Sequence, residues 1–237
     1  MNIRQFEDLI IYELQQVIED IIQSIQELNI SAKSRSGAEI SDWIEEQFVE
    51  FTKEHKYFKR SEYAPKGKTK NPWDARTYFV INDLTEEIWI DFKAIKISGL
   101  NSNPDIGTPD KVVNFIKEGH FYLVYVYIYY QAKGSKLEFV KSQSGETYSK
   151  VYFLKDISST VRRNPKNQLQ VNVSEPPVYR SREQFILLLI DKLRSSYQRQ
   201  INISEKKLKE LDKVYNELIE ANNKSESEIM DNLERLN

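Results

Sequence analysis

Asp74, Asp91 and Lys93 are the residues of this sequence whose types and spacing could support phosphodiester hydrolysis. Asp91 and Lys93 flank Phe92, directly after the run Glu87–Ile90. Alternate side chains of a β-strand point to the same face, so Asp91 and Lys93 would project together while Phe92 enters a core. Charges on an apolar strand are costly unless they are neutralised or used. The pattern therefore indicates a functional site.

Hydrolysis of a phosphodiester requires stabilisation of the negative charge that builds on the phosphate. Mg²⁺ suits this role and prefers carboxylate oxygens as ligands. Asp74 and Asp91, on neighbouring predicted strands, could bind Mg²⁺, and Lys93 could orient or activate the attacking water and share the phosphate charge. A D-x-K tripeptide alone is more often a surface charge pair. The upstream Asp74 on an adjacent strand favours the catalytic interpretation.

Glu39 is a further candidate acid, because it lies at the start of a predicted helix and could contribute to a second metal position. The spacing Ser36-x-x-Glu39 also matches a capping box, in which the glutamate bonds to the backbone N–H at the helix N-terminus. The sequence leaves both roles of Glu39 open.

Helices are predicted at both ends of the chain and between the strands. Apolar residues at three- and four-residue steps predict a long amphipathic helix from about Ile3 to Leu28. A second helix opens at Ser36, and a short one begins after Thr108 and stops at Gly119. Another runs from Phe185 to about Arg199. The tail then carries heptad-like apolar residues, a repeat too short to predict a stable coiled coil.

Strands are predicted in the middle of the chain. Trp73–Ile81 and Glu87–Ile97 form an antiparallel pair joined by a turn at Asn82–Asp83. Phe121–Tyr130 is apolar or aromatic on both faces, which is typical of a central strand. Shorter strands are predicted around residues 137–141 and 148–154. We expect an α/β (α+β) fold with a mixed central sheet flanked by helices.

Composition limits the classes of protein and of site. With 237 residues and 40% hydrophobic content, the chain can form one substantial core. The absence of cysteine excludes disulfides and thiolate metal sites, and two isolated histidines argue against a zinc site. The start of the chain lacks the pattern of a signal peptide, and no apolar run is long enough to span a membrane as a helix. We expect a cytoplasmic protein.

The formal net charge of −2 conceals two basic segments. Residues 53–70 contain seven basic and two acidic side chains, and residues 160–182 contain five and one. Such segments are expected on a polyanion-binding face of a nearly neutral protein. A solvated surface with uneven charge explains either segment equally well.

The residues around the candidate site resemble those of a known group of nucleases. Pro72-Trp73-Asp74 and Asp91-Phe92-Lys93 stand where the PD-(D/E)XK superfamily has its two motifs, although Trp73 is inserted between Pro72 and Asp74. The stretches Lys68–Arg76, Glu87–Ala94 and Ser102–Pro109 are more closely similar to the SwaI-like type II restriction endonucleases. The resemblance covers most of the chain and is weakest in the C-terminal tail.

This resemblance implies a homodimer that cuts double-stranded DNA with Mg²⁺. It further implies a palindromic, all-A·T target such as ATTTAAAT, blunt ends, and a cognate DNA methyltransferase as a genetic partner. A palindrome requires two-fold symmetry in its reader. Adenine in the major groove is read by Asn and Gln, and the thymine methyl by apolar contact.

Candidate DNA-binding residues lie in the basic loops and in two segments rich in Asn and Gln. Asn, Gln and Ser also gather in loops that bind nothing, so each residue taken singly is weak evidence. The candidates are Lys68, Lys70, Arg76, Asn101, Ser102, Asn103, Thr108, Arg162, Arg163, Asn164, Asn167, Gln168, Gln170 and Asn172. Arg76 could instead pair with an acid.

One endonuclease domain, 1–237, is expected. It would comprise an N-terminal helix (1–30), a catalytic core (31–155), an irregular DNA-recognition segment (156–180) and C-terminal helices (181–237). Two alternatives remain: a structure-specific nuclease such as a junction resolvase, and a non-catalytic helical interaction protein. The sequence leaves open the exact target, the cut position, the number of metal ions and which helices form a dimer interface.

Overall fold

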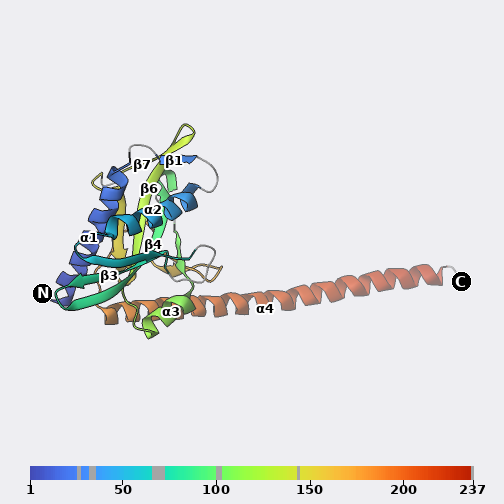
Figure 1. Ribbon diagram of the computed structural model, residues 1–237. Helices are drawn as coiled ribbons and strands as arrows, with labels where there is room; N and C mark the ends of the chain where they lie inside the picture. Colours follow the sequence, from blue (N-terminus) through green and yellow to red (C-terminus); the bar gives the residue numbers. More distant parts are fainter. Residues whose placement is uncertain (26–27, 32–35, 66–72, 100–102, 143–144, 236–237) are drawn as a thin grey trace. The chain divides into compact units, whose positions relative to one another are not determined.

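The computed structural model describes residues 1–25, 28–31, 36–65, 73–99, 103–142 and 145–235 of the chain (Figure 1). The chain forms two compact units, Met1–Leu188 and Leu189–Asn237. Among the described residues, no helix is both long enough and apolar enough to cross a membrane.

The first unit is built on a mixed sheet of seven strands in the described residues. Its order is β1-β7-β6-β4-β3-β2, with β8 also paired to β6. The pair β4–β6 is parallel and the other pairs are antiparallel, which confirms the predicted mixed sheet. The strands are β1 (Leu28–Ser31), β2 (Phe58–Tyr63), β3 (Ala75–Ile81), β4 (Leu84–Lys96), β6 (Leu123–Lys133), β7 (Lys136–Phe139) and β8 (Ser149–Phe153).

The hairpin of β3 and β4 confirms the predicted antiparallel pair. Its register runs from Ile81 opposite Leu84 to Ala75 opposite Ile90. The turn places Asn82 at φ 50°, a left-handed conformation that asparagine tolerates better than most residues. β4 continues beyond this register to Lys96, so the last part of β4 extends past the end of β3.

β6 is the central strand that the aromatic run predicts. Residues 123–130 are all buried, and β6 pairs with β4 on one side and with β8 and β7 on the other. The chain reaches β6 from β4 through a 3₁₀ turn (Ile97–Gly99), β5 (Asp105–Gly107) and α3 (Pro109–Lys117). Such a crossover is required between parallel neighbours.

Helices α1 (Ile3–Gln23) and α2 (Ser36–Thr52) contribute to the main core with one face of the sheet (Figure 1). The amphipathic stripe of α1 and the residues Ile44 and Phe48 of α2 are buried there. On β4 the even-numbered residues Ile88, Ile90 and Phe92 enter this core. The odd-numbered residues of β4 therefore point to the opposite face.

The structure differs from the prediction at the end of the first helix. α1 ends at Gln23, with Ser24 as its cap, although Ile25 and Leu28 continue the apolar spacing. Leu28 instead begins β1, which pairs with β7 at the edge of the sheet. Pairing of the backbone outweighs the local helical pattern at this point.

The C-terminal region is one helix rather than two. α4 runs from Arg182 to Glu234, 53 residues, and Ser181 and Gln184 form a reciprocal cap at its start. The sequence from 182 to 234 contains neither glycine nor proline, so nothing in it stops the helix. The second unit consists of α4 from Leu189 onward.

Lys155 is a buried lysine that ties α1 to the segment preceding α4. Its Nζ lies 2.9 Å from Glu7 Oε2 and 2.9 Å from Asp156 Oδ1, and it donates a 2.9 Å hydrogen bond to the carbonyl of Arg180. The side chain is only 1% exposed. Burying it is tolerated because two carboxylates and a carbonyl replace water.

We expect Lys155→Met to lower the free energy of unfolding by about 3–5 kcal/mol, because Glu7 and Asp156 would remain buried without their cation. Urea denaturation measures this change. Lys53→Met is the matched control, since Lys53 pairs with Glu50 at the surface, and we expect it to change stability by less than about 1 kcal/mol. Equal stability of the two variants would contradict the structural role of Lys155.

Candidate functional site

The candidate site lies where β3 ends and β4 continues. The backbone N–H of Asp74, directly before Ala75 at the start of β3, donates to the carbonyl of Ile90 (2.8 Å). Besides burial, the charge of Asp91 raises the pKa of Asp74, so the two carboxyl groups lie close together. The Oδ2 atom of Asp74 accepts a 2.8 Å hydrogen bond from the N–H of Phe92. The structure thus brings the two predicted aspartates together.

Lys93 completes the cluster as the spacing predicts. Its Nζ lies 2.5 Å from Asp91 Oδ1, and the side chains of Asp91 and Lys93 are 16% and 30% exposed. A strand explains the contact, because residues two apart lie on one face. A pair this shielded from water interacts more strongly than a surface pair.

The electrostatics of the cluster show an excess of negative charge. Burial and the charge of Asp91 raise the pKa of Asp74 to about 6, although Lys93 opposes the change. Burial raises the pKa of Asp91 also, against the lowering effect of Lys93. Burial lowers the pKa of Lys93, but Asp91, Asp74 and Asp105 outweigh it and raise the pKa above its ordinary value. Lys93 is therefore a cation at neutral pH.

Glu45 is a further acid of the site that the sequence analysis missed. Burial, Asp74 and other carboxylates raise the pKa of Glu45 to about 8. The face of α2 that carries Glu45 lies against β4. Two residues on the same face of α2 as Glu45 contact Phe92 of β4. Ser41, four residues before Glu45, donates its Oγ hydroxyl to the carbonyl of Phe92 (3.4 Å), and the ring centroid of Phe48, three residues after Glu45, is 6.0 Å from that of Phe92.

Glu39 is placed differently from Glu45. It is exposed near the start of α2, and a separation of six residues turns it by about 240° around the helix axis. The sequence offers five acids on this helix beside the stripe Ile40, Ile44 and Phe48, and periodicity alone does not show which one faces the strand that carries Asp91. Only the packing of α2 on β4 distinguishes Glu45.

Glu45→Gln is expected to stabilise the protein at pH 8 in the presence of a chelator. The raised pKa means that the folded state holds a proton that the unfolded chain releases near pH 4.5. Stability is therefore lost as pH rises from about 4.5 to about 8. The substitution removes this loss and should raise the melting temperature by roughly 2–4 °C at pH 8, with little change at pH 4.5.

Glu39→Gln is the control on the same helix, and we expect it to change the melting temperature by less than about 1 °C at either pH. A destabilised Glu45→Gln variant at pH 8 would show that Glu45 does not lie in the acidic cluster.

The donors of the cluster fit a hard divalent cation. Asp74, Asp91 and Glu45 supply carboxylate oxygens, and Lys93 is the cation paired with Asp91. Raised pKa values of these acids mean that added positive charge would be favourable. Within the described residues, no three acidic or histidine side chains already form a closed set of metal ligands. Asp74 Oδ2 accepts a hydrogen bond from the N–H of Phe92, and Asp91 Oδ1 pairs with Lys93. Both oxygens are therefore engaged in contacts within the protein.

A small second sheet joins the two Asn- and Gln-rich segments. Its order is β5-β10-β9, with β9 at Arg162–Arg163 and β10 at Leu169–Gln170. Gln170 Nε2 donates to Asp105 Oδ1 (2.8 Å), and Asn164 Nδ2 donates to the same oxygen (3.3 Å). The predicted irregular segment 156–180 thus contains two short strands, which the sequence analysis did not predict.

A buried hydrogen bond connects the small sheet to the candidate site. Tyr125 on β6 donates its hydroxyl to the carbonyl of Ile106 on β5 (2.7 Å). Tyr125 is the register partner of Asp91 across the parallel pair of β4 and β6. Asp105, which precedes Ile106, is also one of the carboxylates that raise the pKa of Lys93. The small sheet and the cluster therefore adjoin.

Several predicted DNA-binding residues have contacts within the protein. Arg76 pairs with Glu62 and with Glu87 (3.2 Å), which is the acid pairing that the sequence left open. Thr108 caps α3 by accepting from the N–H of Lys111. Other contacts of this kind are those of Arg163 with Asn167 (2.6 Å) and of Asn172 with Ser174 (2.7 Å).

The remaining predicted contact residues are described only in part. Asn103 and Gln168 are half-buried and Arg162 is exposed. Four predicted residues, Lys68, Lys70, Asn101 and Ser102, lie outside the described residues.

Comparison with known protein families gives one finding. The model of the SwaI-like family, described as SwaI restriction endonuclease, matches residues 2–211. The match includes the carboxylate–lysine cluster, α2 and the small sheet. It ends within α4. No curated protein matches the chain.

Proposed function

Because this chain belongs to the SwaI-like family of restriction endonucleases, and is therefore a type II restriction endodeoxyribonuclease that acts on DNA, we propose that Asp74, Asp91 and Lys93 form its catalytic centre. The observation that carries the proposal is the 2.5 Å contact of Lys93 with Asp91, near Asp74, whose pKa both residues affect. A shielded cation held beside two carboxylates of raised pKa is suited to phosphodiester hydrolysis.

Each residue of the centre has a distinct role. Lys93, held by Asp91, donates hydrogen bonds to the phosphate that carries the scissile bond and offsets the charge that builds there. Its raised pKa makes it a donor and not a base. Asp74, with a pKa of about 6, is mostly ionised above neutral pH and can orient the attacking water. Asp91 keeps Lys93 in position.

Mg²⁺ is the proposed cofactor, and Asp74 and Asp91 would hold it. When bound, it supplies Lewis-acid chemistry that offsets phosphate charge and makes water a better nucleophile. Glu45, rather than Glu39, is the further acid that we propose, because burial and the charges of Asp74 and Asp91 raise its pKa. Bound Mg²⁺ would also remove the mutual repulsion of these acids.

The small sheet is the proposed reader of DNA sequence. Gln170 and Asn164 present amide groups, which are suited to adenine in the major groove. Their amides donate to Asp105 in the described structure, and base edges could replace that acceptor. The contact of Tyr125 with Ile106 sets the sheet beside the catalytic centre.

The family supports finer proposals about the target. We propose a palindromic, all-A·T site of the ATTTAAAT kind, blunt ends, a homodimer that binds the two half-sites, and a cognate methyltransferase as genetic partner. Two-fold symmetry of the site requires two copies of the reader.

Gln170→Ala is expected to reduce discrimination between DNA sites by about 1–3 kcal/mol, which is roughly 10–100-fold. Competition between a cognate duplex and a duplex with one changed base pair measures this ratio. Gln131→Ala is the matched control, because Gln131 also donates to a carboxylate, Glu138 (2.6 Å), but from the far end of β6. Equal discrimination by both variants would exclude Gln170 as a reader.

A plasmid digest tests the proposed specificity against the alternative of a junction resolvase. We expect the protein with Mg²⁺ to cut linear duplex DNA that contains the target into discrete fragments. A resolvase would cut branched DNA and leave the linear duplex intact. Cleavage of branched substrates alone would overturn the proposed sequence specificity.

A further inference from the structure

Helix α4 carries a row of basic side chains along one side. Lys192, Arg199, Lys206 and Lys213 follow one another at intervals of seven residues. Seven residues turn an α-helix by about 700°, so each of these residues lies within about 20° of the next. Lys192 is half-buried, and the other three are exposed, as is every residue from 197 to 235. We call these four residues the basic stripe.

The basic stripe meets little opposing charge on its own side of the helix. Its four residues fall within an arc of about 60°, and Glu210 is the one acid of residues 192–213 that falls within the same arc. Glu210 Oε1 lies 3.9 Å from Lys206 Nζ, and the two side chains are 60% and 79% exposed. An ion pair this long and this exposed contributes little to stability. Lys206 can therefore exchange Glu210 for a stronger anion.

The positive charge of the second unit is confined to its first part. Residues 192–213 contain seven basic and three acidic side chains, whereas residues 214–235 contain two basic and six acidic ones. Glu220 stands where the next member of the seven-residue series would lie. The match to the family model ends at residue 211, so it includes three residues of the stripe and leaves out the acidic part. The stripe spans about 32 Å, close to the length of about 34 Å of one turn of B-DNA.

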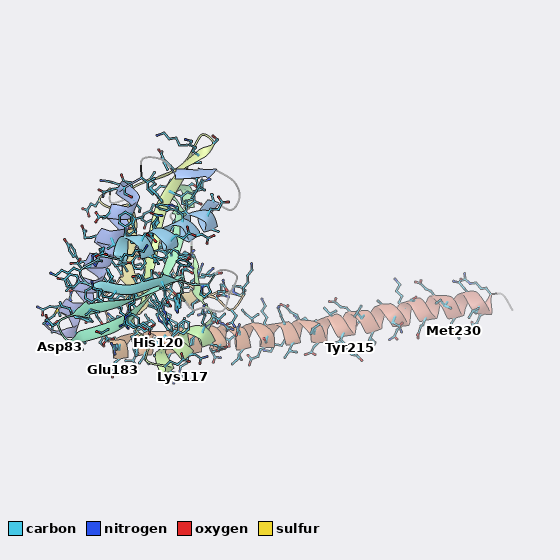
Figure 2. The ribbon with its side chains drawn as sticks, viewed as in Figure 1. Asp83, Lys117, His120, Glu183, Tyr215 and Met230 are labelled. Carbon is cyan, nitrogen blue, oxygen red and sulfur yellow. The ribbon has the colours of Figure 1, made fainter. Side chains whose placement is uncertain are left out.

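Apolar side chains of the same segment lie on the opposite side of the helix. Leu208, Leu211 and Tyr215 (labelled in Figure 2) are 62%, 61% and 65% exposed. They are turned by about 130–170° from the middle of the basic stripe. If this apolar side lay in the head-group region of a membrane, the stripe would point away from the lipid phosphates. The arrangement therefore favours DNA, on which this family acts, as the polyanion that meets the stripe.

We propose that the basic stripe of α4 binds the phosphate backbone of duplex DNA without regard to base sequence. Contacts of lysine and arginine with phosphates supply affinity and carry no information about the bases. The stripe holds the enzyme on DNA that lacks the target as well as on DNA that contains it. This role is separate from base recognition by the small sheet. The inference rests on the action of the family on DNA and not on the proposed catalytic residues.

The salt dependence of binding tests the proposal, because each phosphate contact releases counterions from DNA. The probe is a labelled duplex that lacks ATTTAAAT, in the presence of a chelator. We expect the double variant Arg199→Gln with Lys206→Gln, in the full-length protein, to reduce the slope of log K against log salt by about 1.8. At about 0.1 M salt, this change corresponds to binding that is roughly 10–100-fold weaker.

The double variant Arg194→Gln with Lys207→Gln is the matched control. It also removes one arginine and one lysine from exposed positions of α4, but these lie about 130° and 90° from the middle of the stripe. We expect it to change the slope by less than half as much. Glutamine is a good helix former, and circular dichroism checks that both variants keep the helix.

Equal slopes of the two double variants would overturn the stripe as a DNA contact. Binding to phosphatidylserine vesicles that the stripe variant loses, with an unchanged slope on DNA, would assign the stripe to a membrane and overturn the proposal also. Single-turnover cleavage of the target at saturating protein should be unchanged in the stripe variant. This readout distinguishes a failure of the stripe from a failure of the proposed catalytic centre.

Discussion

Asp91→Asn is expected to lower the rate of DNA cleavage by about 10³-fold or more while DNA binding is retained. The substitution keeps the shape of the side chain but removes the charge that holds Lys93 Nζ at 2.5 Å. It also removes one of the proposed ligands of Mg²⁺. Single-turnover cleavage and a gel-shift assay measure the two properties separately.

A second readout of Asp91→Asn does not depend on activity. Ca²⁺ should raise the melting temperature of the unmodified protein, because binding to the folded state stabilises it, and this increase should be smaller in the variant. Asp83→Asn is the control, since Asp83 lies in the turn between β3 and β4 (Figure 2). Full activity of Asp91→Asn would remove Asp91 from the mechanism.

Lys93→Met is expected to lower the cleavage rate by about 10²–10⁴-fold, because it removes the cation that contacts Asp91. Lys93 also lowers the pKa of Asp74. Without Lys93, the pKa of Asp74 should rise above about 6, so residual cleavage should begin at a higher pH than in the unmodified protein. A pH profile of the single-turnover rate measures this displacement.

Lys96→Met is the matched control, because Lys96 is an exposed lysine three residues further along the same strand. We expect it to keep nearly full activity and the original pH profile. If Lys93→Met and Lys96→Met behaved alike, the charged strand would be only a surface edge, as the non-catalytic alternative requires.

The sequence predicts the centre of the fold well because patterning is strong there. β6 is buried on both faces, so its residues are apolar or aromatic at every position from Leu123 to Tyr130. The hairpin of β3 and β4 follows from alternation and from the Asn82–Asp83 turn. The end of α1 is not predicted by the sequence pattern, because Ile25 and Leu28 keep a helical spacing. Leu28 instead belongs to β1, whose backbone pairs with β7.

The candidate site is predicted in part for the same reason. The period of a strand places Asp91 and Lys93 together, and the hairpin places Asp74 beside them. Glu45 could not be distinguished from Glu39, since the choice depends on how α2 packs on β4. The pairing of β5 with β10 joins residues about 60 positions apart, and such contacts leave no local periodic signal.

The most direct test of the catalytic proposal is to sequence the ends of genomic DNA digested by the purified protein with Mg²⁺. We expect rare, identical ends within one palindromic site, and we expect these ends to be lost in Asp91→Asn. Ends at unrelated sequences, or identical ends that persist in Asp91→Asn, would contradict the proposal.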